Sequence, residues 1–136
     1  MSQASESATP ERPTPERPRS ERQVTVYHNP ACTTSRKVVA LLEEAGAAPR
    51  VVEYLKVGWT GPQLRELLTR MGASARDILR VRGTPAEELG LTAPDASDEA
   101  ILEAMIRHPI LVNRPIVVGP RGAALARPPE RALELI

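Results

Sequence analysis

Hydrophobic positions alternate in short runs and helical repeats once the chain passes residue 22. The β-branched and aromatic run at 24–27 predicts a strand. Apolar side chains then recur at helical spacing from about Ser35 to Ala45, and Gly46 follows as a C-terminal cap. A second β-type run at 51–55 predicts another strand. Such a compact strand–helix–strand unit favours parallel pairing through a right-handed crossover.

The middle of the chain carries helical periodicity. Its predicted helices span 63–71, with Thr60 as N-cap and Gly72 as the end, then 74–80, and then a segment that starts at Ser97 and places Ile101, Leu102, Met105 and Ile106 on one face. This region interrupts two β-containing parts of the chain. It therefore reads as a helical insertion.

The β pattern returns near the C-terminus. Apolar runs at 116–118 and 123–126 flank a glycine-containing turn and predict a hairpin. Residues 129–136 predict a closing helix with proline in its first turn. The order βαβ, helical insertion, ββα predicts an α/β protein with a thioredoxin-like fold.

The first 22 residues have a different composition. The pentapeptide Thr9–Pro13 is repeated immediately as Thr14–Pro18, among Ser, Gln and Glu. Such a segment has almost nothing to bury, and its prolines donate no backbone hydrogen bonds. We expect residues 1–22 to form a disordered tail and residues 23–136 to form one domain.

Composition narrows the class of protein further. The net charge is +1, Phe is absent, and Trp59, Tyr27 and Tyr54 are the only aromatic residues. The core must then be aliphatic, and a nucleic-acid surface is not expected. No apolar run approaches the ~18 residues of a membrane span, and the first residues lack a signal-peptide core. We expect a cytoplasmic protein that binds no membrane.

The chain has a single cysteine, Cys32. One cysteine excludes an internal disulfide, a CxxC redox pair and a cysteine-cluster zinc site, and no other pattern predicts a bound metal, flavin or nucleotide. Of the 18 basic residues only Lys37 and Lys56 are lysines, which leaves sixteen arginines. Most of these arginines fit a solvated surface.

Cys32 falls between the first predicted strand and the helix that follows. Free amides and the helix dipole at that position favour a thiolate over a thiol, and the same amides can hold an oxyanion. Ser35 and Arg36 face the same side, where a hydroxyl donates to the thiolate and a guanidinium adds positive charge. His28 either lowers the thiol pKa or fixes the loop by hydrogen bonds. The alternative for Cys32 is a small buried hydrophobe.

Three sequence segments carry a resemblance to a known family. They are His28-Asn-Pro-Ala-Cys-Thr-Thr-Ser-Arg36, His108-Pro-Ile-Leu-Val-Asn-Arg-Pro-Ile-Val-Val118 and Arg127-Pro128. Together they closely resemble the glutaredoxin-linked arsenate reductases, the ArsC family, over about residues 24–136. The tail lies outside the resemblance.

The resemblance implies a role for particular residues. Cys32 matches the cysteine that attacks arsenate, and His28 and Ser35 match residues that support its thiolate. The oxyanion-binding arginines of the family match Arg80, Arg114 and Arg127, and Pro115 matches the cis-proline of thioredoxin-like folds. Guanidinium groups suit arsenate because they stay charged and bind its oxygens bidentately.

The implied activity is reduction of arsenate to arsenite. In this scheme the Cys32 thiolate attacks arsenic, glutathione or another small thiol attacks next, and glutaredoxin regenerates the enzyme. A single cysteine fits the scheme, because the other sulfurs must come from outside the chain. We expect no bound cofactor and a monomeric enzyme.

Two alternatives remain open. Spx-type regulators share this fold and bind RNA polymerase, but they typically carry a redox CxxC where this chain has Cys32-Thr-Thr-Ser35. Other relatives keep the ArsC motif as thiol oxidoreductases without arsenate activity.

Overall fold

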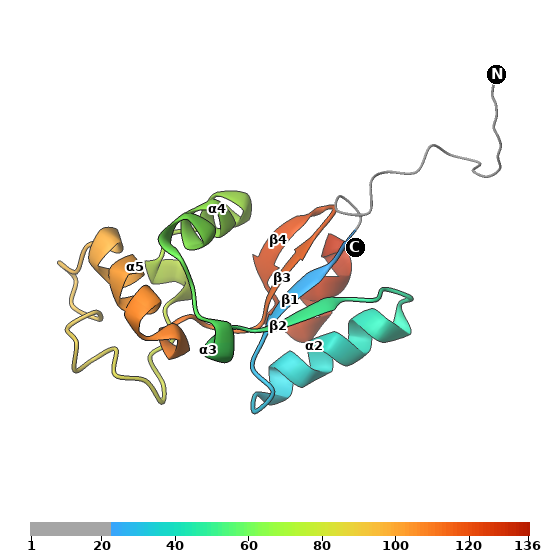
Figure 1. Cartoon of the computed structure of the whole chain (residues 1–136), viewed down its shortest axis with the longest axis horizontal. Coiled ribbons are helices and arrows are strands. Elements are labelled where there is room, and N and C mark those ends of the chain that lie inside the picture. The colour runs from blue at the N-terminus through green and yellow to red at the C-terminus, as the bar shows by residue number, and fades with distance from the viewer. Residues whose placement is uncertain (1–22) are drawn as a thin grey trace, which may run out of the picture.

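The computed structural model describes residues 23–136, so the expected disordered tail at 1–22 lies outside the described residues (Figure 1). The strands are β1 (Thr25–His28), β2 (Arg50–Glu53), β3 (Ile116–Gly119) and β4 (Gly122–Leu125). The α-helices are α2 (Thr33–Glu44), α3 (Tyr54–Val57), α4 (Gly61–Met71) and α5 (Asp98–Arg107). Three 3₁₀ segments complete the fold: η1 (Arg76–Ile78), η2 (Pro109–Leu111) and η3 (Pro129–Leu135).

The strands form one sheet in the order β2-β1-β3-β4. β1 and β2 are parallel, with Val26 opposite Val51, whereas β3 runs antiparallel to both β1 and β4. The parallel strand pair and the C-terminal hairpin that the sequence predicted are therefore confirmed. The mixed sheet with its flanking helices is the predicted thioredoxin-like α/β fold.

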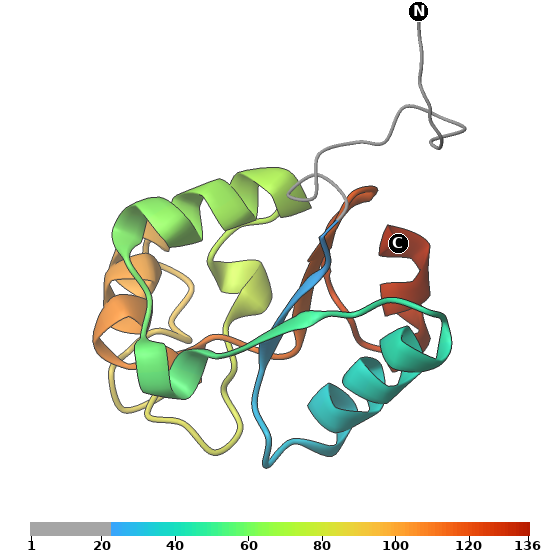
Figure 2. The same cartoon turned by 45° about the vertical axis from the view of Figure 1, so that its right-hand side comes forward.

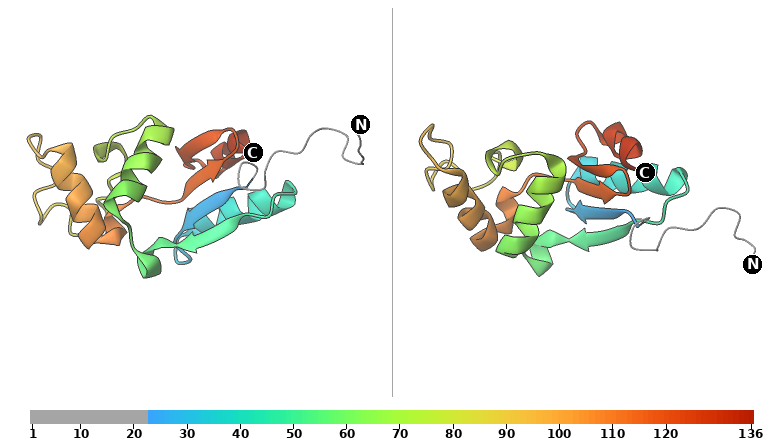
Figure 3. Two further views of the ribbon diagram at one scale, coloured as in Figure 1. Left: turned by 45° about the horizontal axis from the view of Figure 1, so that its top comes forward. Right: turned by 90° about the horizontal axis from the view of Figure 1, so that it is seen from above.

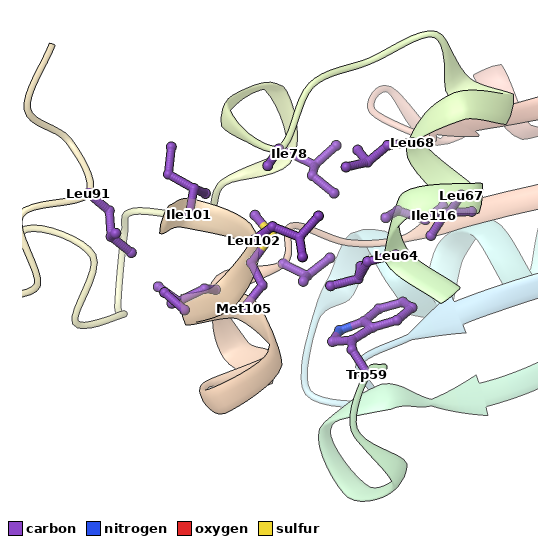
Figure 4. Close-up of a cluster of buried hydrophobic side chains, with 14 of the residues drawn as sticks. Trp59, Leu64, Leu67, Leu68, Ile78, Leu91, Ile101, Leu102, Met105 and Ile116 are labelled. Atoms are coloured by element: carbon purple, nitrogen blue, oxygen red, sulfur yellow. The ribbon is translucent and has the colours of Figure 1, made fainter. Parts of the chain in front are cut away.

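The sheet separates two hydrophobic clusters. Figure 2 shows the sheet between the helical insertion on one side and α2 with η3 on the other. Successive residues of β3 point to opposite faces, so Ile116 packs with the insertion whereas Val117 packs with Val38 and Leu42 of α2. Figure 3 shows the insertion, coloured green to orange, at one end of the molecule. Figure 4 shows the hydrophobic side chains in the core of the insertion, among them Leu64, Ile101 and Met105, packed in one cluster.

The aromatic residues pack together in the insertion's core. Trp59 is buried, and its ring lies 4.9 Å from that of Tyr27 and 5.2 Å from that of Tyr54. Apart from Met105, the other buried hydrophobic side chains are aliphatic.

The N-caps that the sequence predicted for two helices, Thr60 and Ser97, are confirmed. The Thr60 hydroxyl accepts from the Gln63 amide at 3.2 Å, and the Gln63 side chain accepts from the Thr60 amide at 3.4 Å, which makes a capping box for α4. The Ser97 hydroxyl accepts from the Ala100 amide at 3.0 Å at the start of α5. Gly72 ends α4 in the left-handed conformation, with φ of +65°.

Several element boundaries differ from the sequence prediction. The strand predicted at 51–55 ends at Glu53, because Tyr54 begins α3 and its hydroxyl donates a hydrogen bond to the Val112 carbonyl. The helix predicted at 74–80 is only the short η1. Leu79 then forms an isolated β-bridge with Val112, so Arg80 follows a bridge rather than ending a helix. The closing helix is a 3₁₀ segment that buries Ala132 and Leu135.

Candidate active site

The loop between β1 and α2 is held by its own hydrogen bonds. The Asn29 side-chain oxygen accepts from the Ala31 amide at 2.9 Å, and the Asn29 carbonyl accepts from the Cys32 amide at 2.9 Å. The buried Ser35 hydroxyl accepts from the Asn29 amide at 3.3 Å. These bonds place Cys32 at the N-cap of α2 with extended backbone.

Cys32 is half-buried and acidic. Burial raises its pKa, but hydrogen bonding from the Ser35 amide, the Arg114 guanidinium, the Ser35 hydroxyl and the Thr34 amide outweighs burial, so the pKa is lowered to about 6. At pH 7 the side chain is then mostly thiolate. The position read from the sequence as favouring a thiolate has that chemistry, and Cys32 is not fully buried.

The two other predicted supports of the thiolate act differently. Arg36 is exposed and donates from Nη1 to the Pro30 carbonyl at 2.7 Å and from Nη2 to the Thr33 hydroxyl at 3.4 Å. These bonds tie Arg36 to the loop, and the leading contributions to the lowered pKa of Cys32 come from Ser35, Arg114 and Thr34. Direct support of the thiolate by Arg36 stays a prediction.

His28 is buried at the end of β1. Burial lowers its pKa below the ordinary value, with Glu53 opposing the shift and Arg36 adding to it. The imidazole is therefore mostly neutral at pH 7 and supplies no full positive charge to the thiolate. Its Nδ1 atom is buried without a hydrogen-bond partner.

Three arginines from separate segments meet near Cys32. Arg80 is held through its amide, which donates to the Leu111 carbonyl at 2.7 Å, and its Nε donates to the Arg82 carbonyl at 3.2 Å. Arg127 Nη1 donates to the Arg114 carbonyl at 2.8 Å. Burial, followed by the charges of Arg114 and Arg127, lowers the pKa of Arg80, while the charge of Cys32 raises it. The predicted site residues are thus brought together.

This arginine set has no acidic partner within the described part of the chain. The ion pairs formed among residues 23–136 join Lys56 to Glu53, Arg65 to Glu99 and Arg107 to Glu103. The Nε atom of Arg114 is buried without a hydrogen-bond partner. Guanidinium groups that repel one another and lack carboxylates form a place where an anion is favourable.

Pro115 follows Arg114 directly and is buried. The Arg114–Pro115 peptide bond is cis, the geometry that the resemblance implies. The Arg127–Pro128 bond is also cis, which the sequence did not predict. The Pro115 carbonyl accepts from the Ala126 amide at 2.9 Å, so the two cis segments are joined.

One residue near the site was missed from the sequence. Tyr54 is fully buried, and its hydroxyl donates to the Val112 carbonyl at 2.7 Å. Burial raises its pKa to about 12, and the Arg114 guanidinium opposes that rise through its charge and by hydrogen bonding to the hydroxyl. The sequence offered no signal for this contact, because Tyr54 and Arg114 lie sixty positions apart and Tyr54 fitted a strand pattern.

Within residues 23–136 no group of three or more His, Cys, Asp and Glu side chains is arranged to hold a metal ion. Over the same part of the chain, no helix is both long and apolar enough to cross a bilayer.

The fold and the site define a class: a thioredoxin-like α/β protein with an acidic thiol at a helix N-terminus, facing a cluster of arginines. The family model of the ArsC family matches residues 27–135, and the chain belongs to that family.

Relatives and solved structures agree. The chain is 49% identical over 113 residues to an arsenate reductase of Rhizobium meliloti strain 1021, covering 83% of this chain and 81% of the relative. It is 43% identical to an arsenate reductase of Escherichia coli K12, covering 83% and 80%. The structure of an arsenate reductase from Vibrio cholerae superposes with a TM-score of 0.79 at 40% identity, covering 85% of this chain and 98% of that chain.

Proposed function

We propose that this protein is an arsenate reductase that converts arsenate to arsenite through the single nucleophile Cys32, with glutathione or another small thiol as co-substrate. One observation carries the proposal: a thiol with a pKa of about 6 lies beside three arginines that have no carboxylate partner among residues 23–136. The relatives named arsenate reductase support the choice of oxyanion.

The first step is attack on arsenic. The Cys32 thiolate forms a sulfur–arsenic bond, and one arsenate oxygen takes up two protons and leaves as water, so arsenic stays in the +5 state. Arg80, Arg114 and Arg127 bind the remaining oxygens and stabilise the charge that develops in the transition state. Attack at neutral pH requires an ionised sulfur, which the lowered pKa of Cys32 provides.

Reduction of arsenic uses the sulfur of Cys32 and one external thiol. Two thiols supply two electrons and become one disulfide, while arsenic passes from +5 to +3 and is released as arsenite. Cys32 is the only cysteine of the chain, so the second sulfur comes from glutathione or an equivalent small thiol. Glutaredoxin then reduces the disulfide that joins the enzyme to the small thiol. This requirement for a reducing thiol pool supports a cytoplasmic location.

The test is turnover by the purified full chain with arsenate, glutathione, glutaredoxin and its reductant, with arsenite as the measured product. We expect arsenite to form and Cys32→Ser to abolish it. Arg114→Ala should lower kcat/KM by about 30- to 1,000-fold, an amount typical for loss of one transition-state hydrogen-bond donor. Arg131→Ala, which removes an exposed arginine of η3, is the matched control and should leave turnover unchanged.

Turnover by Cys32→Ser would exclude the mechanism. A folded wild-type chain that reduces glutathione mixed disulfides but makes no arsenite, with any of the small thiols as donor, would instead place it among the ArsC-like thiol oxidoreductases without arsenate activity. Recovery of RNA polymerase on the immobilised chain, together with no turnover, would favour the Spx-type alternative.

A further inference from the structure

Tyr54 connects the proposed oxyanion site to the core of the helical insertion. Its side chain has no exposed surface, and its ring packs 5.2 Å from that of Trp59. Its hydroxyl donates its one hydrogen to the Val112 carbonyl at 2.7 Å, two residues before Arg114. The phenol is therefore fixed at both ends, by ring packing and by a main-chain hydrogen bond.

The orientation of this hydroxyl determines what it offers to Arg114. Because its hydrogen is used on Val112, the oxygen presents lone pairs to other donors. Val112 lies two residues before Arg114, whose Nε atom is buried without a hydrogen-bond partner. The Arg114 guanidinium opposes the rise in the pKa of Tyr54 and lowers the pKa of Cys32, so this one cation is near both the phenol and the sulfur.

The neutral Tyr54 phenol differs from a carboxylate in its effect on the charge of Arg114. A carboxylate at this place would orient the guanidinium but cancel its charge, and would repel both a thiolate and an oxyanion. A phenol buried in the core stays neutral over the working pH range, so it orients Arg114 and leaves the full positive charge for the site.

We propose that Tyr54 is a positioning residue for Arg114, holding the guanidinium toward Cys32 through a hydroxyl that is itself fixed by the Val112 carbonyl. The inference rests on the proposed role of Arg114 in the oxyanion site. It predicts that removing the Tyr54 hydroxyl raises the pKa of the Cys32 thiol, although Tyr54 acts on that thiol only through Arg114.

The experiment measures the rate of Cys32 alkylation by iodoacetamide against pH, with and without sulfate as the anion probe, in full-length chains. In Tyr54→Phe we expect the midpoint to rise by about half a unit to one unit and sulfate protection to weaken by about tenfold. Tyr27→Phe, which removes the only other tyrosine hydroxyl from the same aromatic group, should match the wild type. A folded Tyr54→Phe whose midpoint is unchanged or lower would overturn the proposal.

Coupling separates positioning from a general structural effect. In an Arg114→Lys background, Tyr54→Phe should cause no further shift of the midpoint, because the guanidinium that the hydroxyl holds is already gone. An equal shift in both backgrounds would mean that the hydroxyl acts without Arg114. Neither readout uses arsenate turnover, so the positioning role and the proposed reaction can fail separately.

A second measurement serves if Tyr54→Phe does not fold. The chain has two tyrosines, so 3-fluorotyrosine incorporated into Tyr27→Phe labels position 54 alone. We expect its fluorine resonance to move more on Arg114→Lys than on Arg80→Lys. Equal movement, or none, would contradict the proposed contact between the Tyr54 hydroxyl and Arg114.

Discussion

Arg127 donates a hydrogen bond of 2.8 Å from Nη1 to the main-chain carbonyl of Arg114. The bond fixes the side chain of one predicted oxyanion ligand on the backbone of another, although their positive charges repel. A guanidinium has five N–H donors, so this contact leaves others for a ligand. A bound dianion would neutralise this repulsion, so binding a dianion is electrostatically favourable for these arginines.

The Arg127–Arg114 contact predicts different outcomes for two substitutions. Arg127→Ala removes both the charge and the hydrogen bond and should lower kcat/KM for arsenate by about 30-fold or more. Arg127→Lys keeps the charge but not the bidentate geometry, so it should lower kcat/KM by less than Arg127→Ala does. Steady-state kinetics of both variants check this, with Arg131→Ala as the control. Equal kinetics for all of them would remove Arg127 from the site.

The acidity of Cys32 predicts a pH profile. With a pKa of about 6, the alkylation rate by iodoacetamide should be at its plateau above pH 7 and about tenfold lower at pH 5. Arg114→Ala should move the midpoint upward, because a donor to the thiolate is lost. A wild-type midpoint near 8.5, the ordinary pKa of cysteine, would contradict the hydrogen bonding described for the sulfur.

The same shift links stability to pH. The folded-state pKa of Cys32 lies below that of the unfolded chain, so the thiolate stabilises the fold fully above the unfolded pKa, and this contribution is lost as the pH falls through about 6. The difference in unfolding free energy between the wild type and Cys32→Ser should therefore shift in favour of the wild type as pH rises from 6 to about 9. Urea titrations across this range measure it, and a difference that is flat with pH would oppose the assignment.

Asp98 connects α5 to the segment that leads to Arg80. Its two carboxylate oxygens accept from the Ala75 amide at 3.0 Å and the Arg76 amide at 3.2 Å, at the start of η1. Asp98→Ala should cost about 1–2 kcal/mol of unfolding free energy, because these amides lose their partner. The neighbouring Glu99→Ala loses only an exposed ion pair with Arg65 and should cost less than about 1 kcal/mol. Urea unfolding compares the two variants, and equal costs would contradict the capping role.

Gly119 ends β3 in close contact with the C-terminal segment. A Cβ atom at this position would overlap the Leu135 carbonyl oxygen, which is main chain and has little freedom to move. Gly119→Ala should therefore destabilise the fold by about 2–3 kcal/mol, a cost typical of overpacking. Gly72→Ala is the control, since a Cβ there meets open space and only the left-handed backbone opposes it, at about 1 kcal/mol. Thermal unfolding of both variants checks the order.

Local chemistry explains what the sequence predicted well. The strand before Cys32, the helix after it and the caps at Thr60 and Ser97 depend on neighbouring residues, and the structure has all of them. The alternation of apolar residues was enough to indicate the parallel pair and the hairpin. The placement of a lone cysteine at a helix N-terminus was likewise readable, because the free amides there belong to adjacent residues.

Long-range packing decided the rest. The strand predicted through residue 55 ends early because the Tyr54 hydroxyl finds the Val112 carbonyl fifty-eight positions away, and η1 is short because Leu79 pairs with Val112. The same contacts place Arg80 beside Arg114, and the hairpin brings Arg127 to both. No periodicity distinguishes these arginines among sixteen, and in the sequence only the resemblance to the ArsC family singled them out. The sequence alone thus determined the fold class and the place of the lone cysteine at a helix N-terminus, because both depend on neighbouring residues. Only the tertiary structure decided which arginines lie near the sulfur and what holds them there, because those contacts join residues far apart in the chain.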